Sequence, residues 1–150
     1  MKILVLHGVN LNMFGRRDPE HYGHATLEDI NESLFTLADQ LGARLAIFQS
    51  NSETAMVERI HSALDENFSA VVINAGAWTH YSYAIADALA ILKCPIVETH
   101  MSRVFDREEF RRHSVLAPVA SGSVAGFGVG SYRLALRAAC ALATGNQELF

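Results

Sequence analysis

KILVLHG, residues 2–8, is a short apolar run that ends in a histidine and a glycine. A strand buried on both faces of a parallel sheet has such a continuous apolar run, without alternation of polar and apolar residues. Four later runs have the same character: RLAIFQS (44–50), AVVINAG (70–76), PIVETHMS (95–102) and SVAGFG (123–128). We predict that these five segments are the strands of the fold.

The segments between the strands have the period of amphipathic helices. Thr26 can cap the first of them, and Gly42 can end it. Strands that alternate with helical crossovers predict an α/β protein with a parallel sheet. We expect helices at about 26–41, 52–66, 80–92 and 130–144, and a short charged helical segment near 106–113.

The chain has 150 residues, of which 50% are apolar, and this content excludes a disordered protein. No linker rich in proline, glycine or serine divides it, so we expect one domain over residues 1–150. The common five-stranded arrangement of this class is flavodoxin-like, with a sheet of order 2-1-3-4-5. The predicted fold is therefore a three-layer α/β sandwich with helices on both faces of a parallel sheet.

Composition disfavours several classes of partner. The net charge of −4 argues against a surface for nucleic acid or anionic membranes. His7 and Asn10 interrupt the N-terminal apolar run before an export signal or membrane span is complete. Cys94 and Cys140 lack the spacing of metal ligands, and we interpret them as buried free thiols. We expect a cytoplasmic protein with neither nucleic-acid nor membrane partners.

Polar residues follow the predicted strands at the rim where parallel sheets bind ligands. HGVNLN follows the first strand, NAGAWTH the third and ETHMSR the fourth, which brings amide, imidazole and hydroxyl groups to one rim. Six of the ten arginines also follow strand one or strand four: Arg16, Arg17, Arg103, Arg107, Arg111 and Arg112. A positively charged rim in an acidic protein predicts a small anionic substrate.

Cofactor and metal motifs are missing from the sequence. The only lysines, Lys2 and Lys93, are predicted at the opposite rim, which disfavours Schiff-base chemistry. Neither a GxGxxG sequence nor a Walker A sequence is present, and zinc motifs such as HExxH are missing too. We therefore expect acid–base chemistry without a cofactor or metal.

Tyr22 lies in the polar segment GRRDPEHYG (15–23), close to Arg16 and Arg17. A phenol with a reference pKa near ~10 is a poor base at neutral pH unless nearby positive charge favours the phenolate. The two arginines supply such charge. The alternative is a surface loop in which the arginines are solvated and the tyrosine only packs.

Among the histidines, His100 is the strongest catalytic candidate. Glu98 lies two residues earlier on the same face of the strand, where a carboxylate can orient an imidazole. His80 follows Thr79 at a helix start and is either a cap-region residue or a ligand contact. The other histidines rank lower: His7, His21, His24, His61 and His113.

Taken together, five ordered segments resemble the type II dehydroquinases, the 3-dehydroquinate dehydratases of the flavodoxin-like fold. The resemblance implies an active-site loop at about 15–24 and a hydro-lyase reaction. In this reaction 3-dehydroquinate loses water by anti elimination through an enolate, giving 3-dehydroshikimate, in the shikimate pathway or in quinate breakdown. The segments are NLNMFGRRDPEHYGHATLEDI (10–30), QSNSE (49–53), NAGAWTHYS (74–82), ETHMSRVFDREEFRRHS (98–114) and GFGVGSYRLAL (126–136).

The resemblance implies catalytic roles for five residues. Tyr22 is the base that removes a proton beside the C3 ketone, and Arg17 keeps Tyr22 ionised. His100, oriented by Glu98, protonates the departing C1 hydroxyl. Asn10 helps to hold a water against the enolate oxygen.

Substrate-binding roles are implied in the same way. Asn74, Ser102 and the backbone amides of Met101 and Ser102 match groups that bind the carboxylate and the C1 hydroxyl. His80 and Arg111 match contacts to the ring hydroxyls.

The resemblance also implies an assembly. Asp87 matches an aspartate that reaches the site of a neighbouring subunit. Arg107 and Arg112 match structural or near-site arginines. The implied homo-oligomer is a dodecamer, a tetramer of trimers.

Several residues depart from the family pattern. The usual NGPNLN reads HGVNLN, with His7 for asparagine and Val9 for proline, and Arg103 replaces a common asparagine. Trp78 and Tyr81 also differ from the usual residues. These departures bear on turnover, affinity and assembly more than on the reaction class.

Two alternative functions follow. One is a catalytically weak paralogue that binds a cyclic hydroxy-acid. The other is a flavin or nucleotide binder, which would need the phosphate loop that the sequence lacks.

Overall fold

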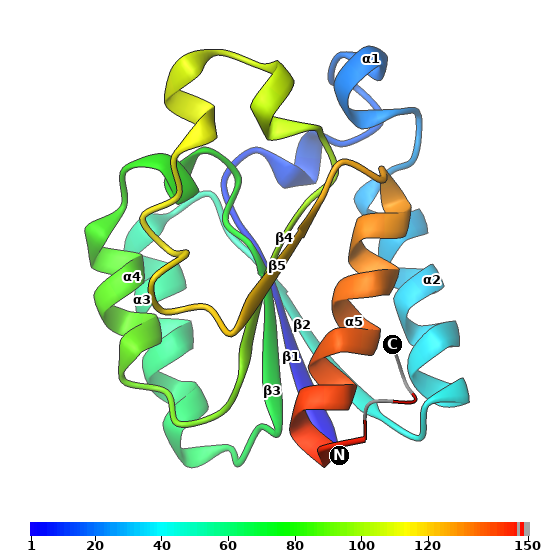
Figure 1. Ribbon diagram of the computed structural model, residues 1–150, viewed down its shortest axis with the longest axis vertical. Helices are drawn as coiled ribbons and strands as arrows, with labels where there is room; N and C mark the ends of the chain where they lie inside the picture. The colour runs from blue at the N-terminus through cyan, green and yellow to red at the C-terminus, as the bar shows by residue number, and fades with distance from the viewer. Residues whose placement is uncertain (147, 149–150) are drawn as a thin grey trace.

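The computed structural model describes residues 1–146 and residue 148. Its strands form one parallel sheet of order β2-β1-β3-β4-β5, with the topological switch point between β1 and β3 (Figure 1). The predicted order is confirmed. The strands are β1 (Lys2–His7), β2 (Arg44–Gln49), β3 (Ala70–Asn74), β4 (Ile96–His100) and β5 (Gly122–Ala125).

Helices cover both faces of this sheet (Figure 1). Helices α2 (Leu27–Gln40) and α5 (Val129–Thr144) pack together on one face, and α3 (Glu53–Ser62) and α4 (Tyr83–Ala90) pack together on the other. The predicted three-layer sandwich is therefore confirmed.

Strand β1 supplies both layers of the core. Ile3 and Val5 pack into the core beneath α2 and α5, whereas Leu4 and Leu6 pack into the core beneath α3 and α4. All four side chains have zero exposure. Burial on both faces is the physical reason why this strand has a continuous apolar run.

Helix α2 begins and ends where its sequence predicts. The Thr26 hydroxyl accepts a hydrogen bond from the Asp29 N–H at 3.1 Å, and the Asp29 carboxylate accepts one from the Thr26 N–H at 2.8 Å. This reciprocal capping box satisfies two N–H groups that the first helical turn leaves free. After the helix, Gly42 takes a φ of 64°, which L-residues with side chains rarely adopt.

Two expected helices have different bounds. The helix expected at 80–92 begins only at Tyr83, because residues before it form the 3₁₀ turn η3 (Gly76–His80) and Ser82 caps α4. The helix expected at 52–66 ends at Ser62 and continues as the 3₁₀ turn η2 (Ala63–Asp65).

The prediction of one helical segment near 106–113 is wrong. The segment consists of two 3₁₀ turns, η4 (Val104–Asp106) and η5 (Glu109–Arg112), separated by two residues with extended ψ values. The fifth strand also ends earlier than expected, at residue 125. Gly126 and Gly128 follow it with φ values of 96° and 56°, which interrupt the extended conformation.

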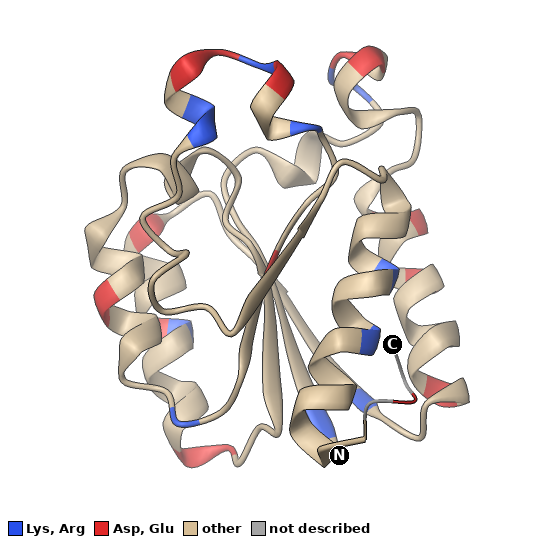
Figure 2. Ribbon diagram, viewed as in Figure 1, with Lys and Arg blue, Asp and Glu red and all other residues tan. Residues whose placement is uncertain are grey.

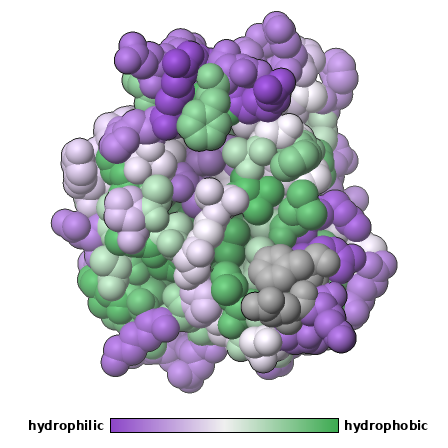
Figure 3. Space-filling model, in the orientation of Figure 1, coloured by the Kyte–Doolittle hydropathy of each residue, from purple (hydrophilic) through white to green (hydrophobic). Residues whose placement is uncertain are grey.

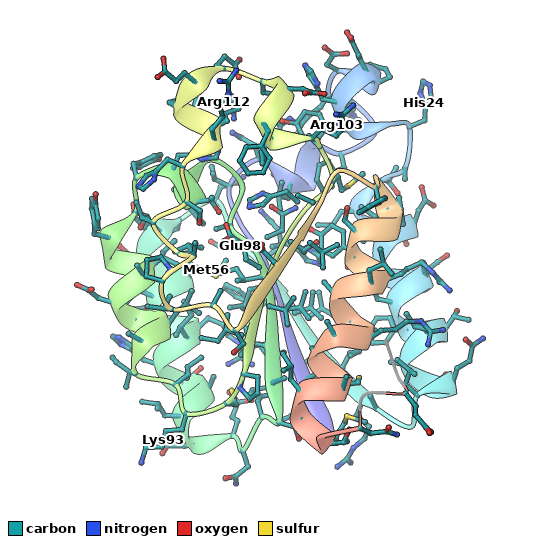
Figure 4. All side chains as sticks on the ribbon, viewed as in Figure 1. His24, Met56, Lys93, Glu98, Arg103 and Arg112 are labelled. Atoms are coloured by element: carbon teal, nitrogen blue, oxygen red, sulfur yellow. The ribbon has the colours of Figure 1, made fainter. Side chains whose placement is uncertain are left out.

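Many charged residues lie at one end of the sheet. Figure 2 shows charged residues gathered on the segments above the carboxyl ends of the strands. Arg103 and Arg112 lie at this end and Lys93 at the opposite end (Figure 4). Within the part of the chain that the structure describes, no helix is both long and apolar enough to span a bilayer.

Candidate active site

A cavity of about 110 Å³ lies beyond the carboxyl ends of β1, β3 and β4. Arg17, Arg107 and Arg111 line it, and of the described residues around it none is acidic. This surplus of positive charge suits an anionic ligand. Nine predicted site residues line the cavity: Asn10, Arg17, Tyr22, Asn74, His80, His100, Met101, Ser102 and Arg111.

The Tyr22 hydroxyl lies between two guanidinium groups. Arg17 donates a hydrogen bond to it at 2.9 Å, and Arg107 donates another at 2.7 Å. The Arg17 guanidinium also lies 4.0 Å from the centroid of the Tyr22 ring. Both donors of these hydrogen bonds are positively charged, which makes the bonds charge-assisted. The Arg17–Tyr22 proximity expected from the sequence is therefore present, and Arg107 adds to it.

Local structure holds Tyr22 in this position. It ends α1 (Pro19–Tyr22), a single helical turn in a segment that we had expected to be a loop. Asp18 caps the turn by accepting a hydrogen bond from the Glu20 N–H at 3.0 Å, and Pro19 occupies the first helical position. The Tyr22 ring packs against Phe14 with a centroid separation of 5.7 Å. Its side chain is therefore buried, with only 9% exposure.

His100 and Glu98 form a pair at the end of β4. His100 Nε2 lies 2.8 Å from Glu98 Oε1, and the glutamate is almost fully buried (Figure 4). Glu98 also accepts hydrogen bonds from Thr79 at 3.0 Å and from Ser114 at 2.9 Å. Nε2 therefore donates to the carboxylate, which leaves Nδ1 as the nitrogen available to a ligand.

The surroundings of Glu98 keep it ionised. Burial alone would raise the pKa of this carboxyl, but the hydrogen bond and charge of His100 and the hydroxyls of Ser114 and Thr79 outweigh that effect. The pKa of Glu98 therefore lies below its ordinary value. An ionised carboxylate at this distance orients the imidazole.

His80 lies next to this pair, with its ring stacked near the His100 ring at a centroid separation of 6.4 Å. Its Nδ1 donates to the carbonyl oxygen of His113 at 2.8 Å. Burial lowers the pKa of His80, and the positive charges of His100 and Arg111 lower it further despite that hydrogen bond. His80 is therefore neutral at pH 7, and its Nε2 presents an acceptor.

Hydrogen bonds from the last residue of β2 and from the turn after it hold the loop that carries Asn10. Asn10 takes a φ of 65°, and its N–H donates to Asn51 Oδ1 at 2.9 Å. Gln49 Nε2 donates to the same oxygen at 3.1 Å and to the Gly8 carbonyl at 3.2 Å. These contacts fix the loop although Val9 replaces the rigid proline of the family pattern.

Glycines allow the loops after β1 and β3 to approach closely. A Cβ atom at Gly8 would lie 2.2 Å from the Ala75 carbonyl oxygen, and one at Gly76 would lie 2.7 Å from the Val9 carbonyl oxygen. The Gly8 N–H donates to the Asn74 carbonyl at 2.7 Å. Only residues without a side chain fit these positions, and the contact brings Asn10 and Asn74 to the same cavity.

Comparisons with known proteins identify the family. The family described as dehydroquinase class II matches residues 1–140. The chain belongs to this family. A 3-dehydroquinate dehydratase of Pelobacter propionicus is 60% identical over 98% of this chain and 99% of its own. Another, of Leptothrix cholodnii, is 63% identical over 93% of each chain.

Solved structures agree with this class II dehydroquinase assignment. The type II dehydroquinase of Butyrivibrio crossotus has a TM-score of 0.91 and 39% identity, and covers 93% of this chain and 97% of its own. The type II dehydroquinase of Propionibacterium acnes has a TM-score of 0.89 and 44% identity, with coverages of 93% and 95%. The predicted resemblance and the flavodoxin-like fold are therefore confirmed.

Two predicted site residues of this dehydroquinase lie outside the cavity. Glu98 lies behind His100 and contacts it directly. Asp87 lies on the exposed side of α4, so a single chain does not bring it to the cavity.

Arg107 is the functional candidate whose place the sequence left open. Its contact with Tyr22 spans 85 residues of the sequence, and Arg107 and Ser102 are also in hydrogen-bond contact at 3.4 Å. The resemblance implied only a structural or near-site role for Arg107, without the group that it contacts.

Arg103 is one of the residues that depart from the family pattern. The exposed Arg103 pairs with Asp106 at 3.0 Å, lies over Gly126 and does not line the cavity. In the described residues, no group of three or more His, Cys, Asp or Glu could hold a metal ion.

Proposed function

We propose that this dehydroquinase is a 3-dehydroquinate dehydratase that removes water by anti elimination through an enolate. The observation that carries the proposal is the Tyr22 hydroxyl held by Arg17 and Arg107 in a cationic cavity that His100 also lines. A base and an acid at one cavity are what a two-step elimination needs.

Tyr22 is the proposed base. Its phenolate takes the proton beside the C3 ketone, and the electron pair of the broken C–H bond moves into the enolate. Arg17 and Arg107 support this role because their donors, at 2.9 and 2.7 Å, favour the phenolate over the phenol. Packing of the Tyr22 ring against Phe14 holds the hydroxyl at the cavity.

His100 is the proposed acid. As the enolate collapses, the C1–O bond breaks and a proton from His100 joins the departing hydroxyl, so that water leaves. The Glu98 carboxylate at 2.8 Å supports this role by stabilising the imidazolium that donates the proton. Thr79 and Ser114 fix the carboxylate in turn.

Neighbouring groups bind the substrate in this proposal. Asn74, Ser102 and the N–H groups of Met101 and Ser102 take the carboxylate and the C1 hydroxyl. Arg111 and the Nε2 acceptor of His80 take the ring hydroxyls. Asn10 holds a water against the enolate oxygen, where charge develops. All of these groups line the same cavity.

We further propose the dodecamer, with Asp87 completing a neighbouring subunit's site. The edge strand β5 and helix α5 form an apolar groove of about 410 Å³ lined by Val97, Val124, Leu134 and Leu142. Figure 3 shows apolar atoms gathered over this part of the molecule, below a hydrophilic rim. An open sheet edge beside exposed leucines favours association between subunits.

The cellular role follows from the reaction proposed. Dehydration of 3-dehydroquinate serves the shikimate pathway, and hence aromatic amino acid biosynthesis, or quinate breakdown. Cys94 and Cys140 are free thiols, which suits a cytoplasmic location.

The test is to mix the purified protein with 3-dehydroquinate and to measure the rise in ultraviolet absorbance of the enone product. We expect turnover by the wild type and a loss of about a thousandfold in Tyr22→Phe, with ligand affinity nearly unchanged. Thr36→Ala, at an exposed threonine on α2, is the control and should retain full rate.

A Tyr22→Phe variant that keeps most of its rate would place the base elsewhere. A wild type that binds the compound without turnover would favour the weak paralogue that binds a cyclic hydroxy-acid. Borohydride added with substrate should leave the enzyme active, and a trapped covalent adduct would contradict a reaction without an imine.

A further inference from the structure

His7 is fully buried at the end of β1, yet both of its ring nitrogens have partners. Nε2 lies 2.9 Å from Asn31 Oδ1 on α2, and Nδ1 lies 2.9 Å from the Tyr132 hydroxyl on α5. The two rings are in contact, with centroids 5.3 Å apart. Three elements of one face of the sheet therefore meet at a histidine that the proposed reaction does not use.

The chemistry of the partners fixes the direction of each hydrogen bond. An amide oxygen only accepts, so His7 Nε2 carries the proton and donates to Asn31. Nδ1 of the neutral ring then accepts, and the Tyr132 hydroxyl donates to it. Burial lowers the pKa of His7 to about 4, so the ring is neutral at pH 7.

The same hydroxyl lies beside a residue of the cavity. His7 and Asn74 are paired in the register of β1 and β3, on the face of the sheet whose core also holds Tyr132. Because the proton of Tyr132 is directed at His7, the phenol oxygen is left to accept from the Asn74 amide. Asn74 Oδ1 accepts from the Gly76 N–H at 3.1 Å, which directs Asn74 Nδ2 away from that contact.

We propose that His7 and Tyr132 are positioning residues, which orient the Asn74 amide so that its second N–H faces the cavity and donates to an oxygen of the bound substrate. A flipped amide would present its carbonyl oxygen, which repels a carboxylate. The inference rests on the proposed function for the identity of the substrate, but the orientation of Asn74 does not depend on it.

Four variants separate positioning from support of the fold. Tyr132→Phe removes the hydroxyl between His7 and Asn74. His7→Asn keeps an acceptor near the Nδ1 position, whereas His7→Gln keeps a donor near the Nε2 position and loses the acceptor. Leu136→Val is the control, because Leu136 is buried on α5 in the same core but contributes no polar group.

Steady-state kinetics with 3-dehydroquinate are measured well below the melting temperature of each variant. Tyr132→Phe and His7→Gln should raise KM about tenfold and leave kcat within about twofold, since one hydrogen bond of substrate binding is lost. His7→Asn should keep KM near the wild-type value. Leu136→Val should lower the melting temperature and leave KM unchanged.

Atomic-resolution crystal structures of the wild type, Tyr132→Phe and Leu136→Val provide a readout without turnover. We expect the Asn74 side chain to rotate in Tyr132→Phe and to keep its place in Leu136→Val. An unmoved Asn74, or an unchanged KM in both Tyr132→Phe and His7→Gln, would overturn the proposal and leave a network that only supports the fold. If the wild type does not act on 3-dehydroquinate, the proposed function fails, while the position of Asn74 still decides this inference.

Discussion

At the scale of single residues, Tyr22 depends on a second arginine as well as on Arg17. Arg107 approaches its hydroxyl at 2.7 Å and Ser102 at 3.4 Å, so one planar guanidinium serves two partners. We expect Arg107→Ala to lower kcat about a hundredfold, as loss of one aimed cationic donor typically does. Arg107→Lys should not restore the rate, because a compact ammonium does not reproduce the fork of a guanidinium.

Steady-state kinetics with 3-dehydroquinate provide the measurement. Arg112→Ala is the control, because this nearby arginine is exposed and lies outside the cavity. Full activity in Arg107→Lys would mean that charge alone, without geometry, supports Tyr22.

His7 makes the stability of the fold depend on pH. Burial lowers its pKa from 6.5 to about 4, so the unfolded chain binds a proton between these values and the folded chain does not. The His7 contribution to stability is therefore complete above pH 6.5 and is lost as the pH falls towards 4. Between pH 7.5 and pH 5 we expect a loss of about 2 kcal/mol of unfolding free energy from this residue.

Urea unfolding at the two pH values measures this loss. His7→Asn, which does not titrate in this range, should show a pH dependence smaller by that amount. Equal pH dependence in the wild type and in His7→Asn would show that His7 binds a proton in the folded chain as readily as in the unfolded chain.

At the scale of elements, the capping box determines where α2 begins. Thr26→Ala removes the hydroxyl that accepts from the Asp29 N–H, and we expect a loss of about 1 kcal/mol in unfolding free energy. Urea unfolding measures it. Thr36→Ala is the matched control on the same helix, because that exposed hydroxyl only contacts the Glu32 carbonyl within the helix. Similar losses of unfolding free energy in both variants would mean that the Thr26 cap stabilises the helix no more than another exposed hydroxyl does.

The segment 104–112 shows what limits prediction at this scale. Its charged residues have helical spacing, but the structure has two 3₁₀ turns with Arg107 and Glu108 between them. The contact of Arg107 with Tyr22, 85 residues away in the sequence, holds the backbone in this form. Tertiary contacts of this kind override local helix propensity.

At the scale of the whole molecule, we expect the protein to be a closed assembly of twelve chains of 16.4 kDa. Sedimentation velocity at a working concentration measures the mass. Leu134→Arg places a second positive charge beside Arg137 in the groove next to β5 and should dissociate the assembly into smaller species, because burial of an unpaired charge is costly.

A monomer in the wild type would leave Asp87 without a partner subunit. A variant with unchanged mass would show that the groove lies outside the subunit contacts. Lys93→Asp, at the opposite rim, is the control for a change of charge alone.

The sheet order, the family and most of the residues around the cavity are readable from the sequence. Buried strands require continuous apolar runs, and ligand groups follow the carboxyl ends of parallel strands, so both are visible in the order of residues. Which of these groups contact one another is visible only in the folded chain. Arg107 reaches Tyr22 and His7 reaches Tyr132 across 85 and 125 residues, respectively. Such pairs depend on the packing of α5 and of the segment after β4 against the rest of the chain, which local patterns do not encode.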